Sequence, residues 1–312
     1  MPLKILVTGS LAYDRIMDFP GRFKDQILPD KLHILNVSFF LEKMEEGFGG
    51  TAGNISYNLS LLEEKPKIFA NVGIKDFGNY KKHLLRHNVD LSLVKEYPDQ
   101  QTASAYIITD LDDNQIAGFF PGAMFHPVST RRFIGSADIA IVSPQNPADM
   151  TQLPEIFKKK KISYIFDPGQ QTTSLSGAQL KKSITGAKVL IGNDYEISLV
   201  KKKTGWTTND LLKASKILVI TLGEKGSVLK SASQIVKIPK IKREKTVDPT
   251  GAGDAYRAGL IKGLISGYDL EKTGRLAAVV SVYAVEKYGT QNHKFTFSQV
   301  KSRYRQNFKD SL

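Results

Sequence analysis

DPTGAGDAY, residues 248–256, puts three small residues at a turn and an acid directly before an apolar-periodic run. That run predicts a helix over residues 251–266. The backbone N–H groups of the turn, 251–253, would be free at the helix start, where the helix dipole favours an anion. An aspartate beside an anion site suits proton transfer. The stretch therefore predicts phosphoryl transfer, with Asp254 as the base that accepts the proton of an attacking hydroxyl.

The same turn has a plainer interpretation, in which glycine allows tight packing and Asp254 compensates the helix dipole. Two neighbouring residues favour the chemical interpretation. Asp248 and Thr250 add oxygen ligands just upstream of the turn, where a cation beside phosphates would be useful.

Length and composition limit the class of protein. A chain of 312 residues with 41% hydrophobic content fits one large α/β domain with an appendage. No stretch approaches the ~20 apolar residues that span a bilayer, and the N-terminus lacks the features of a signal peptide. The absence of cysteine excludes disulfides and thiolate metal sites. We therefore expect a cytoplasmic protein without a membrane partner.

The formal net charge of +13 raises the question of nucleic-acid binding. The basic runs fall at the ends of expected helices or in turns, where lysine is an ordinary solvated residue; they lie at 158–161, 181–182, 201–203 and 240–245. They are not interleaved with aromatic residues, and no helix-turn-helix, zinc or RNA-binding signature is present. We expect no nucleic-acid partner, although a positive field would attract nucleotides.

Short apolar or β-branched runs alternate with amphipathic stretches, which is typical of βαβ units and a parallel sheet. Strands are expected at 4–7, 67–72, 139–142, 164–166, 189–191 and 217–221. Helices are expected at 51–62, 79–87, 154–159, 194–202, 251–266 and 271–287. The predicted fold class is α/β, with a mainly parallel central sheet flanked by helices.

Two segments, about residues 15–48 and 102–122, contain strand-like runs without intervening helices. Within the second segment, 103–109 and 115–120 have the pattern of a hairpin with a polar turn. Together the segments are expected to form a small β-sheet lid over the carboxyl edge of the main sheet, where open α/β sheets bind ligands. Because no repeat or Pro-rich linker is present, the whole chain, 1–312, is expected to be one domain.

A second glycine-rich element, GFGGTAGN, spans residues 47–54. Its spacing is GxGxxxG and it does not follow an expected strand, so the signal for NAD is weak. Backbone approaching a small polyol, with Asn54 as donor and acceptor to its hydroxyls, explains it better. An ordinary glycine turn is the alternative. Asp14, just after the first strand, lies either in a turn or where a carboxylate would meet a ligand at the sheet edge.

Two further elements follow expected strands. Asn193 and Glu196 lie three residues apart on one side of a starting helix, a spacing that suits hydrated Mg²⁺ and equally suits a capping box. TLGEKG, residues 221–226, ends another strand with glycines that would admit a nucleotide or form a hairpin turn.

In order and spacing, this set resembles the PfkB/ribokinase family of carbohydrate and nucleoside kinases over essentially the whole chain. The C-terminal signature of the family matches Asp248, Thr250, Gly251, Ala252, Gly253 and Asp254. Its N-terminal signature matches Gly49, Gly50, Ala52, Asn54, Ser56 and Gly73. Asn193 and Glu196 match its NxxE motif, and Thr221, Gly223 and Gly226 match its nucleotide-binding loop. The chain departs from the pattern at Glu63, usually glycine or serine, and at Tyr256, usually phenylalanine.

The resemblance implies a ribokinase-like fold and a kinase that uses ATP and Mg²⁺. It implies that Asp254 is the base, and that the N–H groups of Gly251, Ala252 and Gly253 hold the γ-phosphate. The substrate hydroxyls would be held by Asp14, Gly49, Gly50 and Asn54. The nucleotide and its hydrated Mg²⁺ would be held by Asn193, Glu196, Thr221, Gly223 and Gly226, and Asp248 and Thr250 match positions that bind a monovalent cation such as K⁺ in many members.

The pattern around Asp14, with residues 19–23 and 112–115, resembles the bacterial and archaeal adenosine or nucleoside kinase branch. An aromatic platform for a base would come from residues 119–125, which also suit the core of a lid. We therefore expect a small-molecule acceptor, a ribonucleoside before a ribose- or fructose-type sugar. A catalytically idle binding or regulatory homologue is the remaining alternative, and the protein is expected to be a monomer or homodimer.

Overall fold

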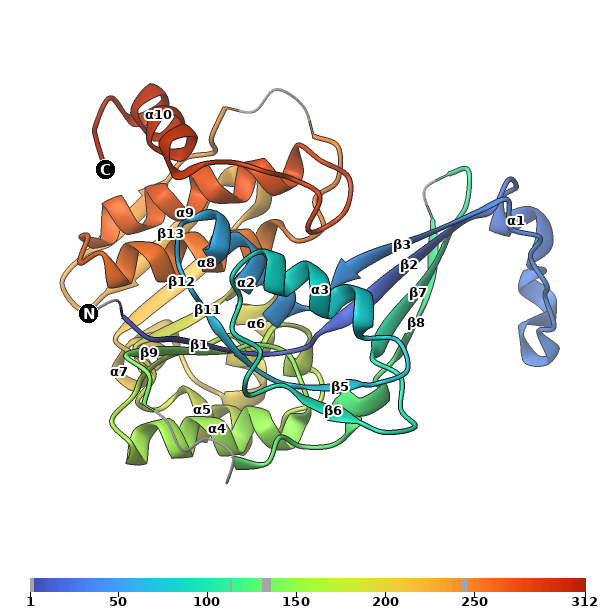
Figure 1. Cartoon of the computed structure of the whole chain (residues 1–312), viewed down its shortest axis with the longest axis horizontal. Helices are drawn as coiled ribbons and strands as arrows, with labels where there is room; N and C mark the ends of the chain where they lie inside the picture. Colours follow the sequence, from blue (N-terminus) through green and yellow to red (C-terminus); the bar gives the residue numbers. More distant parts are fainter. Residues whose placement is uncertain (1–2, 113, 131–135, 243–245) are drawn as a thin grey trace.

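The computed structural model describes residues 3–112, 114–130, 136–242 and 246–312, so 243–245 of the last basic run lie outside the described residues (Figure 1). The strands of the main sheet are β1 (Ile5–Thr8), β4 (Lys67–Phe69), β9 (Ile139–Val142), β10 (Ser163–Phe166), β11 (Val189–Asn193), β12 (Ile217–Thr221), β13 (Ser227–Ser231) and β14 (Ile235–Ile238). Their order is β14-β13-β12-β11-β10-β9-β1-β4. Neighbours from β4 to β12 pair in parallel, whereas β13 and β14 are antiparallel. The expected mainly parallel α/β sheet is confirmed.

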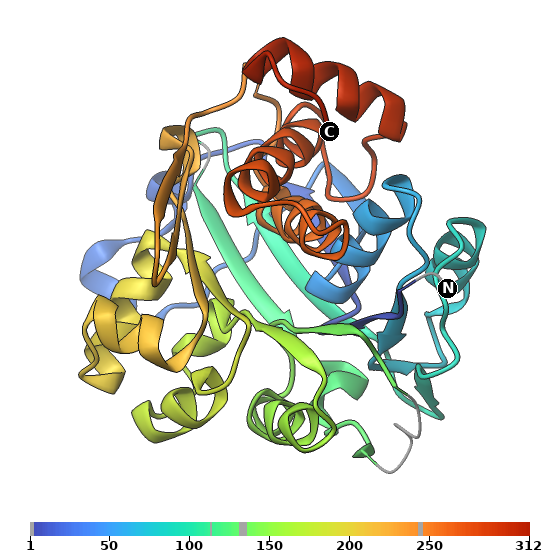
Figure 2. The same cartoon turned by 90° about the vertical axis from the view of Figure 1, so that its left-hand side faces the viewer.

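Helices cover both faces of this sheet (Figure 2). One face carries α2 (Thr51–Leu61), α3 (Gly78–Arg86), α8 (Ala252–Ile265), α9 (Leu270–Val285) and α10 (Phe297–Phe308). The other carries α4 (Pro147–Lys159), α5 (Gly177–Ile184), α6 (Asp194–Thr204) and α7 (Thr208–Ala214). Alternate strand residues point to opposite faces, so Ile139 and Ile141 enter one core while Ala140 and Val142 enter the other. A strand buried on both faces explains the unbroken apolar runs in the sequence.

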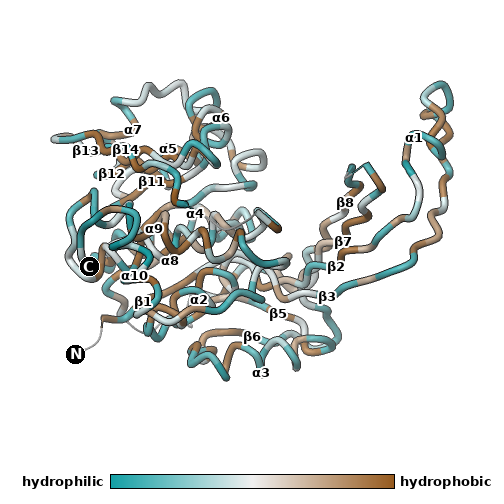
Figure 3. The backbone as a smooth tube through the Cα atoms, turned by 90° about the horizontal axis from the view of Figure 1, so that it is seen from above, coloured by the Kyte–Doolittle hydropathy of each residue, from teal (hydrophilic) through white to brown (hydrophobic). Residues whose placement is uncertain are grey.

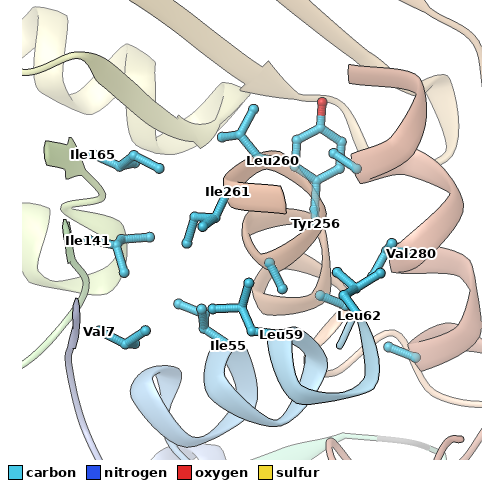
Figure 4. Packing of buried hydrophobic residues seen from close by; sticks show 14 of the residues in the cluster. Val7, Ile55, Leu59, Leu62, Ile141, Ile165, Tyr256, Leu260, Ile261 and Val280 are labelled. Atoms are coloured by element: carbon cyan, nitrogen blue, oxygen red, sulfur yellow. The ribbon is translucent and has the colours of Figure 1, made fainter. Parts of the chain in front are cut away.

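The first core fixes the position of α8. Leu59 of α2 and Ile261 of α8 are fully buried and pack with Val7 of β1 (Figure 4). On the other side of α8, a Cβ added at Gly259 would lie 2.7 Å from the Cα of Ala277, so only a small residue lets α9 approach so closely. Helix α8 is therefore held by packing on two sides.

A second sheet is built from β2 (Ala12–Asp18), β3 (Lys43–Gly49), β7 (Ala103–Thr109) and β8 (Gln115–Phe120), in the order β3-β2-β7-β8. It projects from the main body and carries α1 (Phe23–Gln26) and the 3₁₀ turn η1 (Pro29–Ile34) at its far end (Figures 1 and 3). The expected hairpin over 103–109 and 115–120 is confirmed by the antiparallel pairing of β7 with β8. The sheet begins at Ala12, so Asp14 lies on it rather than in a turn after β1.

Other boundaries differ from the expectation. The strand expected at 67–72 is two strands, because the chain leaves the main sheet at Ala70 and β5 (Asn71–Gly73) pairs with β6 (Lys95–Tyr97). A polar contact accompanies the break, since the Asn71 amide donates to the His126 carbonyl at 2.8 Å. Helix α4 starts at Pro147 rather than 154, where proline suits a first turn. Within the described residues, no helix is long and apolar enough to cross a bilayer.

Candidate active site

A cavity of about 650 Å³ lies at the carboxyl ends of the parallel strands, between the main sheet and the second sheet. The chain leaves β1 toward β4 on one side and returns through β9 on the other, which makes this edge a topological switch point. The strand ends contribute Ser10, Asp167, Asn193 and Thr221 to the wall, the second sheet contributes Asp14, Ala105, Ile107 and Phe119, and the start of α8 contributes Gly251, Gly253, Asp254 and Arg257.

The start of α8 has the geometry of an anion site. Gly251 caps α8 with a φ of 78° and, because glycine has no side chain, the first N–H groups of the helix have no side-chain cap. The left-handed φ requires glycine, and a Cβ there would also lie 3.1 Å from the Thr290 side chain. Gly251 and Gly253 face the cavity. Ala252 does not, since it lines a neighbouring slot and its N–H donates to the Pro249 carbonyl at 3.2 Å.

Asp254 is half-buried at the cavity wall and accepts a hydrogen bond from Asn54 Nδ2 at 2.8 Å. Burial raises the pKa of Asp254 to about 6, and the nearby carboxylates of Asp167 and Asp14 raise it too, whereas Arg257 and Asn54 lower it. A carboxylate with a pKa just below neutrality is mostly ionised at pH 7 and still takes up a proton readily.

Asp14 reaches the same cavity from β2. Gly49 makes room for it, since a Cβ at Gly49 would lie 2.2 Å from Asp14 Oδ2. Burial, and then the charge of Asp248, raises the pKa of Asp14 to about 6. Gly50, with a φ of 84°, caps α2 where a Cβ would lie 2.6 Å from the Ser10 carbonyl oxygen. Gly50 lines the cavity itself, whereas Gly49 does not and acts on it only through the room it leaves for Asp14.

Asn193 and Glu196 form the capping box that their spacing also allowed. Asn193 Oδ1 accepts from the Glu196 N–H at 2.7 Å, and Glu196 Oε2 accepts from the Asn193 N–H at 2.8 Å. Both residues also line the cavity. Burial raises the pKa of Glu196, and the nearby Asp167 raises it further. Their part in holding hydrated Mg²⁺ stays a prediction.

A second cavity of about 350 Å³ adjoins the first at the turn before α8. Thr221, Gly223 and Gly253 line both cavities, and Gly226 lines the second alone. Its other walls are mostly apolar and include Tyr256, Ile241, Ala278, Val282 and Val285. A flat apolar ring would fit this slot, with a chain of phosphates running past Gly253 into the larger cavity.

Thr250 lines the larger cavity, whereas Asp248 does not. Asp248 accepts hydrogen bonds from the Thr250 N–H at 2.8 Å and the Gly289 N–H at 3.0 Å, which ties two loops together. In the part of the chain that the structure describes, no group of three or more His, Cys, Asp or Glu residues is arranged to hold a metal ion. The monovalent-cation role of Asp248 and Thr250 stays a prediction.

The expected aromatic platform is partly present. Phe119 and Met124 line the larger cavity with Ile107. Phe120 and Phe125 do not, and their side chains are 45% and 71% exposed. The cavity thus has apolar side chains as well as the polar side chains of Asp14 and Asn54, and the register of the second sheet puts Asp14, Ala105 and Phe119 side by side on one face.

Two features of the site were not predicted from the sequence. Arg257 makes a buried bidentate ion pair with Asp167, with Nε–Oδ2 at 2.5 Å and Nη2–Oδ1 at 2.6 Å. A signal existed, because Arg257 lies three residues after Asp254 on one helix face and Asp167 directly follows a strand. Gln291 donates to Asn54 Oδ1 at 2.9 Å from an irregular loop, and no local pattern marks it.

The comparisons with known proteins agree with this geometry. The family model for pfkB family carbohydrate kinases matches residues 5–296 of this chain. The nucleoside kinase of Methanocaldococcus jannaschii is 30% identical to this chain over 303 residues, which cover 96% of each chain. The solved structure of the M. jannaschii nucleoside kinase, described as an archaeal member of the ribokinase family, superposes on this chain with a TM-score of 0.87 at 28% identity. The superposition covers 98% of this chain and 100% of that one. The Burkholderia thailandensis nucleoside kinase in complex with inosine gives a TM-score of 0.86 at 35% identity, over 98% of this chain and 99% of that one. The predicted ribokinase-like fold is confirmed.

Proposed function

This chain belongs to the pfkB family of carbohydrate kinases, and from that premise we propose that it transfers the γ-phosphate of ATP to the 5′-hydroxyl of a ribonucleoside, with adenosine as the first candidate. Its class, a phosphotransferase, follows from the family, so the acceptor is the proposal. The relatives from M. jannaschii and B. thailandensis are nucleoside kinases, and the latter binds inosine. The observation that carries the proposal is the junction of two cavities at the turn 251–253, with Asp254 beside it.

The chemistry follows from the position of Asp254. Its carboxylate accepts the proton of the acceptor hydroxyl while that oxygen attacks the γ-phosphorus. The bond from the γ-phosphorus to the bridging β,γ-oxygen breaks, and ADP leaves. Gly251 and Gly253 line the cavity at the positive end of α8, where their N–H groups would stabilise the charge on the transferring group.

The acceptor would lie against a cavity lining that offers both polar and apolar side chains. Asp14 and Asn54 offer a carboxylate and an amide to the ribose hydroxyls, and Ile107, Phe119 and Met124 offer the surface that a purine or pyrimidine needs. A free sugar would leave that apolar surface uncovered. This surface favours a nucleoside over the ribose- or fructose-type alternative. Because the surface belongs partly to the second sheet, we propose that this sheet acts as a lid that excludes water.

Mg²⁺ and K⁺ belong to the same proposal. The oxygen-rich wall around Glu196 fits a hydrated Mg²⁺, which would neutralise charge on the phosphates. Asp248 and Thr250 offer oxygens to a monovalent cation near the turn. A cytoplasmic location is also proposed, in keeping with a chain that has no cysteine.

The test is an acceptor panel. The protein is incubated with Mg-ATP, with and without K⁺, against adenosine, inosine, guanosine, cytidine, ribose and fructose, and ADP release is measured. We expect nucleosides to be phosphorylated, and Asp254→Asn to lower kcat by about 10²–10⁴-fold, the usual contribution of a general base. The matched control is Asp30→Asn at an exposed position outside the cavity. Turnover of sugars alone would overturn the acceptor, and full activity of Asp254→Asn would overturn the base.

A further inference from the structure

Arg257 is a buried cation in the wall of the larger cavity. Only 9% of its side chain is exposed, and its Nε and Nη2 are both taken up by Asp167. Nη1 has no hydrogen-bond partner among the described residues. A guanidinium has five N–H donors in one plane, so the pairing with Asp167 holds Nη1 in place and leaves it free to donate.

The free Nη1 lies against the anion-site turn. A Cβ added at Gly253 would lie 2.8 Å from Nη1, so the guanidinium occupies the space that any other residue would fill. Gly253 lines both cavities and thus marks where the phosphates of a donor would pass from one to the other. Arg257 therefore places a positive N–H donor at that junction, in addition to the backbone N–H groups.

The cavity wall carries more acidic than basic side chains, so a cationic donor there offsets repulsion of a phosphate ligand. Among the described residues that line the cavity, Asp14, Asp167, Glu196 and Asp254 carry carboxylates and Arg257 carries the one cationic side chain. The carboxylates of Asp167, Asp254 and Glu196 hold the pKa of Arg257 above its usual value, against the effect of burial. A polyphosphate entering this wall meets repulsion from four acids, and Arg257 offsets it at the point of transfer.

We propose that Arg257 is a catalytic residue whose Nη1 donates a charge-assisted hydrogen bond to an oxygen of the transferring phosphoryl group, while Asp167 orients the guanidinium. The proposal rests on the proposed kinase function. The proton stays on Arg257 throughout, and the attacking hydroxyl loses its proton to Asp254 as before. A fixed donor aimed at developing phosphoryl charge stabilises the transition state more than the bound substrate.

A buried ion pair also has a purely structural explanation, and the two differ in a measurable way. Replacing both partners of a structural pair by apolar residues of similar size is often neutral for folding, because the pair pays a large desolvation cost. Such a replacement would leave catalysis intact if Arg257 only filled space. It would remove catalysis from a folded protein if Nη1 contacts the phosphoryl group.

The experiment compares Arg257→Lys and the double variant Arg257→Met/Asp167→Leu with the wild type. The matched control is Arg303→Met/Glu286→Leu, which removes another bidentate pair, at 2.9 and 2.6 Å, whose two residues line neither of the two cavities. Readouts are thermal melting, KM for the acceptor, KM for ATP and kcat. We expect both Arg257 variants to lose about 10²–10³-fold in kcat, as when one transition-state donor is removed, with little change in acceptor KM. The control should keep its kcat.

Each result has a definite meaning. A folded double variant with kcat within about threefold of the wild type would overturn the proposal. If the double variant does not fold, Arg257→Lys decides, because lysine keeps the charge beside Asp167 but lacks Nη1; wild-type kcat in that variant would equally overturn it. Because Arg257 contacts the donor phosphate, the same variants test it with a sugar acceptor if the panel shows that nucleosides are not the substrate.

Discussion

Gln291 controls which end of the Asn54 amide faces the catalytic base. It is buried, and its Nε2 donates to Asn54 Oδ1 at 2.9 Å and to the Tyr80 hydroxyl at 2.6 Å. Its Oε1 is 3.0 Å from His83 Nε2, which must donate because a carbonyl oxygen only accepts. With Oδ1 committed to Gln291, Asn54 turns its Nδ2 to Asp254. The perturbation that removes this control without touching the cavity is Gln291→Leu.

The size of the effect follows from these bonds. The variant leaves the buried side-chain oxygen Oδ1 of Asn54 without a donor, at a cost of about 1–3 kcal/mol. It also loses the hydrogen bonds of Gln291 to Tyr80 and His83, at about 1 kcal/mol each, so we expect a loss of about 2–4 kcal/mol in unfolding free energy. The bond from Asn54 favours the charged form of Asp254 and lowers its pKa. A hydrogen bond to a charged group contributes about 1.5–3 kcal/mol, so weakening the bond from Asn54 to Asp254 should raise the pKa of Asp254 by about one.

The assay is the pH dependence of kcat/KM between about pH 5 and 9, with urea unfolding measured in parallel. In the wild type the acid limb should follow Asp254, near its pKa of about 6. In Gln291→Leu it should move upward, so that activity falls more at pH 6 than at pH 9. Gln234→Leu, at an exposed turn, is the control. A destabilised Gln291→Leu that keeps the wild-type acid limb would refute the link between Gln291 and Asp254.

Three further outcomes are expected. Gly49→Ala should raise acceptor KM with little change in ADP affinity, because its Cβ would lie 2.2 Å from Asp14 Oδ2; steady-state kinetics and ADP titration check both. Burial raises the pKa of Asp149 to about 7, above its unfolded value, so ionisation of Asp149 lowers the stability of the wild type as the pH rises from about 4 to 7. The melting temperature of Asp149→Asn should therefore rise relative to that of the wild type from about pH 5 to 8, as thermal melts can measure. Lys203 Nζ donates to the carbonyls of residues 172, 173 and 175 at 2.8, 2.6 and 2.8 Å, so Lys203→Met should cost about 2–3 kcal/mol in urea unfolding and loosen the cavity wall at 169–171.

The parts of the site that the sequence predicted are local. The turn before α8, the start of α2 and the capping box at Asn193 each lie within one loop and the first turn of one helix. Small residues, a cap and a periodic run stand next to one another in such a unit, so the pattern is visible in a short window. The hairpin of β7 and β8 was predictable for the same reason.

The parts that were missed depend on contacts across the chain. Gln291 meets Asn54 over a separation of 237 residues, and Arg257 meets Asp167 over 90. Each residue type is ordinary in its own window, and only the packing of one element on another brings the pair together. Asp14 shows the same limit, because its distance from β1 was visible but its place on a different sheet was not.

The division of the site into two cavities bears on how closure is driven. The second sheet contributes Asp14, Ala105, Ile107 and Phe119 to the larger cavity, and none of its strands lines the smaller one. A ligand shifts a conformational equilibrium only through contacts that differ between the two states. The ring of a nucleotide in the smaller cavity would make no such contact with the second sheet and only its phosphates would reach the larger cavity, whereas an acceptor there would lie against the second sheet directly. Closure of that sheet should therefore follow the acceptor, so that the transferable phosphate is enclosed only once a hydroxyl is present to receive it.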